Sequence, residues 1–166
     1  MSTVRQVFTD TSVLLNLAFA GRLDLLTGLI GYEFVVPEEV LSEVLGPLEQ
    51  GEIGVALQAG FLRRTIMADP GELAVFADLR QFLGLGESAC LALASQRSGL
   101  LASDEKRRLL REAGDRLGPG RVLNTPGLFV LAIRGGLMTI EEADAAKLVL
   151  ERHRFRMKFS SFRDLF

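Results

Sequence analysis

The sequence predicts a three-layer α/β/α fold in which a central, mostly parallel sheet is flanked by helices. Short apolar runs alternate with helical segments along the chain, which is typical of repeated βαβ units. Two of these runs, Arg5–Thr9 and Leu100–Ala102, have the length and composition of buried parallel strands. The 166 residues, 48% of them hydrophobic, suit a single domain spanning residues 1–166 with a proper core.

The first half of the chain offers two strands, each followed by a helix. After the strand Arg5–Thr9 we expect a helix from about Ser12 to Leu17 or beyond, with Ser12 able to cap its first turn. A strand at residues 33–36 leads into a helix at residues 38–45, which ends at Gly46-Pro47. The pattern then predicts helices at residues 48–59, 71–83 and 87–96, and an edge strand at residues 62–67.

The second half continues the alternation. After the strand Leu100–Ala102 the pattern predicts a helix at residues 105–113, a glycine-rich loop and a short strand at residues 121–123. Helices at residues 126–134 and 139–153 follow, and a basic, aromatic tail covers about residues 152–166.

The composition narrows the classes of function. A single cysteine, Cys90, allows neither an intrachain disulfide nor a cysteine zinc site, which favours a reducing compartment and therefore the cytoplasm. The apolar stretch at residues 13–20 is interrupted by Asn16 and is too short to span a membrane, and no targeting segment precedes it. We therefore expect no membrane association.

The net charge of −2 conceals an uneven distribution of charge. Residues 1–60 carry eight acids and two bases, whereas residues 61–166 carry thirteen acids and seventeen bases. The basic residues gather in two clusters, Lys106, Arg107, Arg108 and Arg111, and Arg152, Arg154, Arg156, Lys158 and Arg163. Either cluster can contact phosphates or simply solvate a helix face, and charge alone leaves both interpretations open.

Four acidic residues are the candidates for chemistry: Asp10 in FTDTS, Glu43 in VPEEVLSEV, Glu87 in GLGESAC and Asp104 in LLASDEKRR. Asp10 and Asp104 follow the two buried strands, and ligands of open α/β sheets bind beyond the carboxyl ends of such strands. Clustered carboxylates repel one another and require a cation or raised pKa values. Mg²⁺ and Mn²⁺ prefer oxygen ligands and support phosphodiester hydrolysis, so the set favours a metal-dependent nuclease.

Each acid also has a structural interpretation. Asp10 and Asp104 can cap the helices that follow them, Glu43 can be an exposed helix residue, and Glu87 can stabilise a helix start. What favours chemistry is the joint occurrence of four acids in the expected strand and helix settings. The sequence alone leaves open whether they meet.

The same motifs resemble those of the PIN-domain ribonucleases, in particular VapC-like toxins of type II toxin–antitoxin systems and uncharacterised PIN relatives. FTDTSVLLNLA resembles the opening strand, VVPEEVLSEV the second motif, LGLGESACLALA the third and LLASDEKRRLLREAG the fourth. NTPGLFVLAIRGGLMT resembles the short strand and helix near the end of the domain. Two positions depart from the family pattern, because Glu105 follows Asp104 where many relatives have aspartate, and Asn124 replaces a common glycine.

The resemblance implies a PIN-like fold and cleavage of single-stranded or loop RNA with Mg²⁺ or Mn²⁺. Asp10, Glu43, Glu87 and Asp104 are then the catalytic, metal-binding residues. Ser12 and Asn124 are candidates for orienting a carboxylate or water, although a helix cap and a turn explain them equally well.

The resemblance also suggests partners. Arg107 and Arg108 are candidates for contacts with the RNA backbone. A small antitoxin protein and a second copy of the chain in a homodimer are implied as protein partners.

Two other functions compete with the nuclease. A non-catalytic PIN-like scaffold would bind nucleic acid or an antitoxin without metal-dependent turnover. A haloacid dehalogenase type of phosphatase also begins with an aspartate at a strand end, but it requires a second aspartate two residues later. Ser12 occupies that position, so the phosphatase motif is broken.

Overall fold

The computed structural model describes residues 3–166 and contains a five-stranded sheet in the order β3-β2-β1-β4-β5. Every neighbouring pair of strands is parallel. The strands are β1 (Arg5–Thr9), β2 (Tyr32–Pro37), β3 (Arg63–Thr65), β4 (Leu100–Ala102) and β5 (Val122–Leu123). The parallel sheet that the sequence predicts is therefore confirmed.

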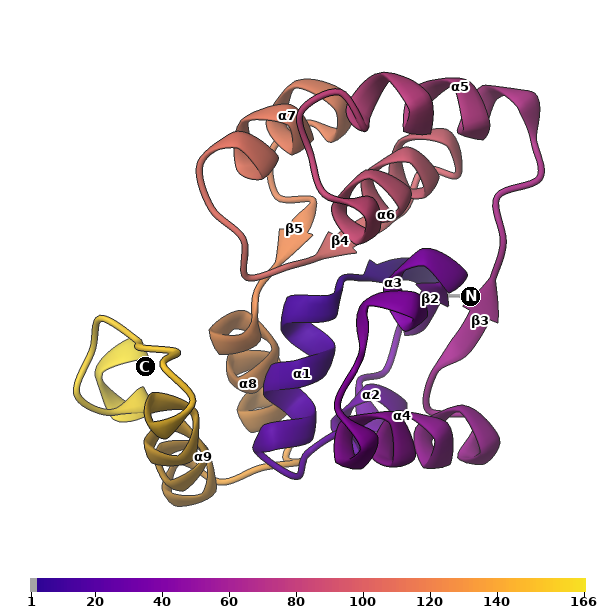
Figure 1. Cartoon of the computed structure of the whole chain (residues 1–166). Helices are drawn as coiled ribbons and strands as arrows, with labels where there is room; N and C mark the ends of the chain where they lie inside the picture. Colours follow the sequence, from indigo (N-terminus) through magenta and orange to yellow (C-terminus); the bar gives the residue numbers. More distant parts are fainter. Residues whose placement is uncertain (1–2) are drawn as a thin grey trace.

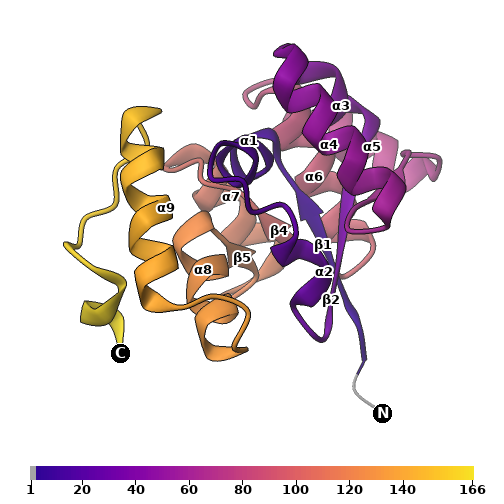
Figure 2. The ribbon, with the colours of Figure 1, turned by 90° about the horizontal axis from the view of Figure 1, so that it is seen from below.

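Helices cover both faces of the sheet and complete the three layers. They are α1 (Thr11–Phe19), α2 (Leu25–Gly28), α3 (Glu38–Glu43), α4 (Pro47–Ala59), α5 (Pro70–Leu79), α6 (Leu85–Gln96), α7 (Arg108–Leu117), α8 (Thr125–Arg134) and α9 (Ile140–Arg152). α6 packs on the sheet, and α5 and α7 pack on α6 (Figure 1). α1, α2, α4, α8 and α9 lie on the opposite side, with α8 and α9 toward the β5 edge (Figure 2).

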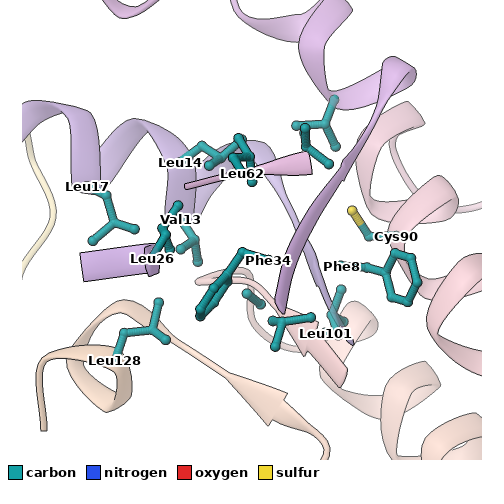
Figure 3. Close-up of a cluster of buried hydrophobic side chains, with 14 of the residues drawn as sticks. Phe8, Val13, Leu14, Leu17, Leu26, Phe34, Leu62, Cys90, Leu101 and Leu128 are labelled. Carbon is teal, nitrogen blue, oxygen red and sulfur yellow. The ribbon is translucent and has the colours of Figure 1, made fainter. Parts of the chain in front are cut away.

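The core occupies both faces of the sheet because successive strand residues point to opposite sides. Phe8 of β1 and Cys90 of α6 lie on one face, while Phe34 of β2 and Val13 and Leu14 of α1 lie on the other (Figure 3). All of these side chains are buried, and full burial of an aromatic or branched aliphatic side chain contributes about 1.5–3 kcal/mol. Cys90 is a free, buried thiol, as expected of a core residue.

The first helix departs from the prediction in its cap. The side chain of Asp10 accepts a hydrogen bond from the backbone N–H of Thr11, so Asp10 caps α1 and the expectation that Ser12 caps it is wrong. The reason is local, because α1 begins one residue earlier than predicted. Ser12 lies inside the first turn, and its hydroxyl is free to contact another segment.

Several boundaries also differ from the prediction. α3 ends at Glu43 instead of residue 45, because Val44 leaves helical geometry at ψ 105°. α7 begins at Arg108 instead of residue 105, because Arg107 has a positive φ of 59° and breaks the helix there. Asp104 therefore does not cap this helix. α5 ends at Leu79, and the short α2 was not predicted because four residues carry too little periodicity to identify.

The basic, aromatic tail folds back on the end of the domain. Phe162 is fully buried and packs against Phe129 of α8, with ring centroids 5.7 Å apart. The carboxylate of Asp144 in α9 accepts hydrogen bonds from the Ser161 hydroxyl at 2.6 Å and from the Phe162 N–H at 2.8 Å. The apolar residues of the tail thus belong to the core, while its basic residues stay at the surface.

The topology places Asp10 and Asp104 at the carboxyl ends of two neighbouring strands inside the sheet. The chain passes from β1 outward to β2 and β3, and then returns to β4 on the other side of β1. Ligands bind at such a reversal of strand order, beyond the carboxyl ends of the strands. Asp10 follows β1 and Asp104 closely follows β4, so both lie at this point. Within residues 3–166, no helix combines the length and apolar character that a membrane span requires.

Candidate functional site

Asp10 lies at the centre of the acidic cluster and is only 3% exposed. Its Oδ1 accepts the N–H of Thr11 at 2.8 Å, and its Oδ2 accepts the hydroxyl of Ser103 at 3.0 Å. The pKa of Asp10 is raised to about 6, mainly by burial and also by the charges of Glu43 and Glu105, although these two hydrogen bonds lower it. Each oxygen keeps a lone pair that a cation can use.

Glu43 reaches Asp10 across the N-terminus of α6. Its Oε1 accepts the backbone N–H of Gly86, and its Oε2 lies 3.4 Å from the hydroxyl of Thr11. A Cβ at Gly86 would lie only 2.8 Å from Glu43 Oε1 and 3.2 Å from Asp10 Oδ1. Glycine, which has no Cβ, therefore allows the two carboxylates to approach each other this closely.

Glu87 enters the cluster from the first turn of α6. The pKa of Glu87 is raised to about 7 by burial first and then by the charges of Asp10, Glu105 and Glu43. No hydrogen bond within the described residues offsets this increase. Glu87 is thus an incompletely solvated carboxylate that faces other carboxylates.

Asp104 is held differently from the other three acids. Its Oδ1 accepts the N–H of Thr125 at 2.7 Å, and its Oδ2 accepts the Thr125 hydroxyl and the side-chain amide of Asn16 at 2.8 Å. These bonds connect the loop after β4 to the start of α8 and to α1. The hydrogen bonds of this carboxylate therefore hold three segments of the chain together.

Glu105 is the acid of the fourth motif that faces the cluster. Its charge raises the pKa of both Asp10 and Glu87. The backbone supports this position, because the Glu105 N–H donates to Ser103 Oγ at 3.1 Å and Ser103 in turn donates to Asp10. Asp10, Glu43, Glu87 and Glu105 are thus near enough for their charges to act on one another, while Asp104 is held by its own polar contacts.

The supporting residues differ in what they contact. Ser12 Oγ accepts the N–H of Asp104 at 3.0 Å and lies 3.5 Å from Ser103 Oγ, so it helps to fix the loop after β4. Asn124 caps α8 by accepting the N–H of Gly127 at 2.8 Å, which matches the turn alternative. In its place, the following residue Thr125 supplies the contact to a carboxylate.

The two arginines proposed to bind RNA lie at the start of α7. Arg107 is exposed and has the positive φ described above. Arg108 donates to the backbone oxygen of Phe82 at 3.3 Å, and its guanidinium lies 6.0 Å from the centroid of that ring. Arg108 is thus partly engaged with the loop before α6.

In the described part of the chain, no three acidic, histidine or cysteine side chains are already spaced to hold a metal ion. The carboxylates carry like charge, so they separate unless a cation holds them together. Glu43 is turned toward the Gly86 N–H and the Thr11 hydroxyl. The donor atoms are nevertheless hard oxygens that converge beside Gly86, and oxygen ligands are those that Mg²⁺ and Mn²⁺ prefer.

A family model described as a PIN domain matches residues 6–164, which is nearly the whole chain. The chain belongs to the PIN-domain family. No curated protein and no solved structure gives a significant match. PIN domains are generally nucleases and usually use divalent metals, so this PIN domain has a nuclease-type fold.

Besides Glu105, three polar residues of this PIN domain contact the acids but are not among the candidates that its sequence predicts. Ser103 connects Asp10 to Glu105, while Asn16 and Thr125 hold Asp104. Asn16 gave a signal, because it interrupts an apolar helix and lies one helical turn after Ser12 on the same face. Ser103 and Thr125 gave none, because a hydroxyl after a strand is common in turns.

Proposed function

We propose that this PIN domain is a metal-dependent endoribonuclease that hydrolyses RNA phosphodiester bonds with Mg²⁺ or Mn²⁺. The observation that carries the proposal is the set of carboxylates around Gly86, in which the pKa of Asp10 rises to about 6 and that of Glu87 to about 7. Such raised values at a reversal of strand order are typical of a functional site.

Asp10, Glu43, Glu87 and Glu105 are the residues that would hold the cation. When bound, a divalent ion lowers the pKa of water and neutralises charge on a phosphoryl oxygen. Ser103 would orient Asp10 through its hydrogen bond at 3.0 Å, and burial of Asp10 would exclude competing water. The sequence predicts Asp104 as a further ligand, and its three hydrogen bonds favour a positioning role instead.

The first experiment is cleavage of a mixed RNA pool by the purified protein with Mg²⁺, with Mn²⁺ and with EDTA. Asp10→Asn keeps the size of the side chain but removes its charge, so we expect cleavage to fall by more than the 10–100-fold typical of supporting residues. Asp115→Asn is the matched control, because Asp115 is an exposed aspartate of α7. It should cut as fast as the wild type.

Each other outcome has a defined meaning. Cutting that survives Asp10→Asn would remove Asp10 from the mechanism and indicate a contaminating nuclease. Tight RNA binding without any metal-dependent cutting would favour the non-catalytic scaffold. Circular dichroism of each variant shows whether a loss of activity reflects a loss of folding.

The proposal extends to a role as the toxin of a toxin–antitoxin pair, which the likeness of the four motifs to VapC-like toxins supports. Expression of the wild type should then arrest bacterial growth, Asp10→Asn should not, and a small protein encoded next to the gene should relieve the arrest. Normal growth with an active nuclease would remove the toxin role alone. The homodimer rests on the same resemblance, and sedimentation measures it directly.

A further inference from the structure

A cavity of about 420 Å³ adjoins the acidic cluster on the side of α1 and α9. Glu43, Asp104 and Glu105 contribute acids to its lining. The lining also contains an aromatic and basic set that the proposed hydrolysis does not use, namely Phe19, His153, Arg154 and Phe155. The size lies within the range of sites for small ligands.

The aromatic part of this lining is a stacked pair. The rings of Phe19 and His153 lie 4.0 Å apart and are nearly parallel, at 6°. Phe19 ends α1 and is half-buried, whereas His153 follows α9 and is exposed. The pair is therefore anchored on the core side and accessible on the side of the imidazole.

Arg154 adds a positive charge next to this pair. It is exposed and has a positive φ of 66°, in the turn that ends α9. Within residues 3–166 the nine ion pairs do not include Arg154. Its guanidinium is thus available to an anion, while the acids lie on the same cavity.

We propose that this cavity binds one unpaired nucleotide of an RNA substrate, with the base stacked on the Phe19–His153 pair and Arg154 bound to an adjoining phosphate. The inference rests on the proposed ribonuclease function and names the form of its substrate. Stacking on aromatic side chains and pairing of arginine with phosphate are the two interactions by which proteins hold single strands.

The arrangement selects single-stranded RNA over a duplex. A base within a duplex is stacked on both faces, so it reaches a protein ring only after it leaves the helix. The cavity shares Glu43 and Glu105 with the acidic cluster, so the bound nucleotide would lie next to the position of the scissile phosphate. The stacked pair would then decide which unpaired segments reach the carboxylates.

Binding is measured separately from cleavage by working with Asp10→Asn protein in Mg²⁺. Fluorescence anisotropy compares a labelled single-stranded RNA, the same RNA as a duplex, and single strands with one abasic position moved along the chain. His153→Ala should weaken binding of the single strand by about 5- to 150-fold. Arg154→Gln should lower the slope of log affinity against log salt by about 0.7.

Arg156→Gln is the matched control, because Arg156 is an exposed arginine two residues away that lines a different cavity. It should leave the abasic pattern unchanged. In the Asp10→Asn protein, the parent of these variants, an abasic site at one position should weaken binding of the RNA. The same abasic site should not weaken binding to the His153→Ala variant any further. That coupling would support a stacked base.

The proposal is overturned if the His153 and Arg154 variants bind as the control does, if the duplex binds as tightly as the single strand, or if the parent binds no RNA. These results do not depend on turnover. Failure of the wild type to cut RNA would instead count against the ribonuclease, so the two failures are distinguishable.

Discussion

Glu72 and Asp10 are both buried carboxylates, yet their surroundings move their pKa values in opposite directions. The side chain of Arg97 donates hydrogen bonds to Glu72 and holds the pKa of that carboxyl below its usual range, against burial. Burial and neighbouring carboxylates raise the pKa of Asp10 to about 6. A buried carboxylate that pairs with an arginine of the same chain stabilises the fold. A buried carboxylate that is surrounded by other carboxylates requires a bound cation to balance its charge.

The largest effect is expected from breaking the Glu72 region. Arg97 donates to both oxygens of Glu72, at 2.7 and 3.2 Å, and also to the Thr65 hydroxyl and the Ile66 backbone oxygen. Arg97→Met would leave the Glu72 side chain, 6% exposed, without its counter-ion. We expect a loss of about 3 kcal/mol in the free energy of unfolding, measured by urea denaturation.

Arg116→Met is the matched control for Arg97→Met. Both arginine side chains are 28% exposed, but Arg116 pairs with Asp78 and Glu112, whose side chains are 59% and 25% exposed. Surface pairs contribute at most about 1 kcal/mol, so the control should lose much less stability. Equal losses for the two variants would contradict the difference drawn between a buried and an exposed partner.

The next effect separates the two acids of the fourth motif. Glu105→Gln removes a charge that faces Asp10 and Glu87, so the affinity for Mn²⁺ should fall about tenfold or more, as titration calorimetry would measure. Asp104→Asn would disturb the bonds to Thr125 and Asn16 and should cost roughly 1–3 kcal/mol of stability.

The reverse order would change the assignment of roles. If Asp104→Asn weakens Mn²⁺ binding more than Glu105→Gln and leaves stability unchanged, Asp104 returns to the set of ligands. These two variants therefore distinguish carboxylates that stabilise the fold from carboxylates that bind a cation.

A further effect is a dependence of stability on pH in the absence of metal. In the folded protein the pKa of Asp10 rises from 3.8 to about 6, and that of Glu87 from 4.5 to about 7. Between these limits the folded state binds more protons than the unfolded chain, so the free energy of unfolding falls as pH rises from about 4 to about 7.

Thermal unfolding measures this effect, because the melting temperature of a domain of this size changes by about 2–4 °C for each kcal/mol of stability. Glu72 has a lowered pKa, so its contribution to the stability of the fold is fully present at pH values above its ordinary pKa. It therefore does not cause the free energy of unfolding to fall as pH rises. Mg²⁺ should raise the melting temperature more at high pH than at low pH, because protons compete for the ligands. An Asp10→Asn, Glu87→Gln protein that keeps the full pH dependence would contradict the assignment.

Most of the fold could be predicted from the sequence, and each error has an identifiable physical cause. The buried strands and most of the helices were predicted because apolar runs and capping residues are short-range signals. The start of α7 was missed because Arg107 adopts a positive φ that no residue pattern announces. The burial of Phe162 was missed because it depends on Asp144 and Phe129, which are distant in the chain.

The site was predictable in part for the same reason. The end of β1 placed Asp10, and α6 placed Glu87 in its first turn. Which of Asp104 and Glu105 faces the cluster depends on the turn after β4, which Ser12 and Ser103 fix from a different segment. The partner of an acid in such a turn is a property of the tertiary structure.

Gly86 allows the volume of the pocket to be changed independently of its charge. Substitutions such as Asp10→Asn change the charge and keep the size of the side chain, so they do not test the role of the space. An alanine at Gly86 adds a single methyl group within 3.2 Å of both Asp10 Oδ1 and Glu43 Oε1 and leaves all the carboxylates in the chain. One glycine thus makes the space between the carboxylates a steric variable that a substitution can change without removing any acid from the site.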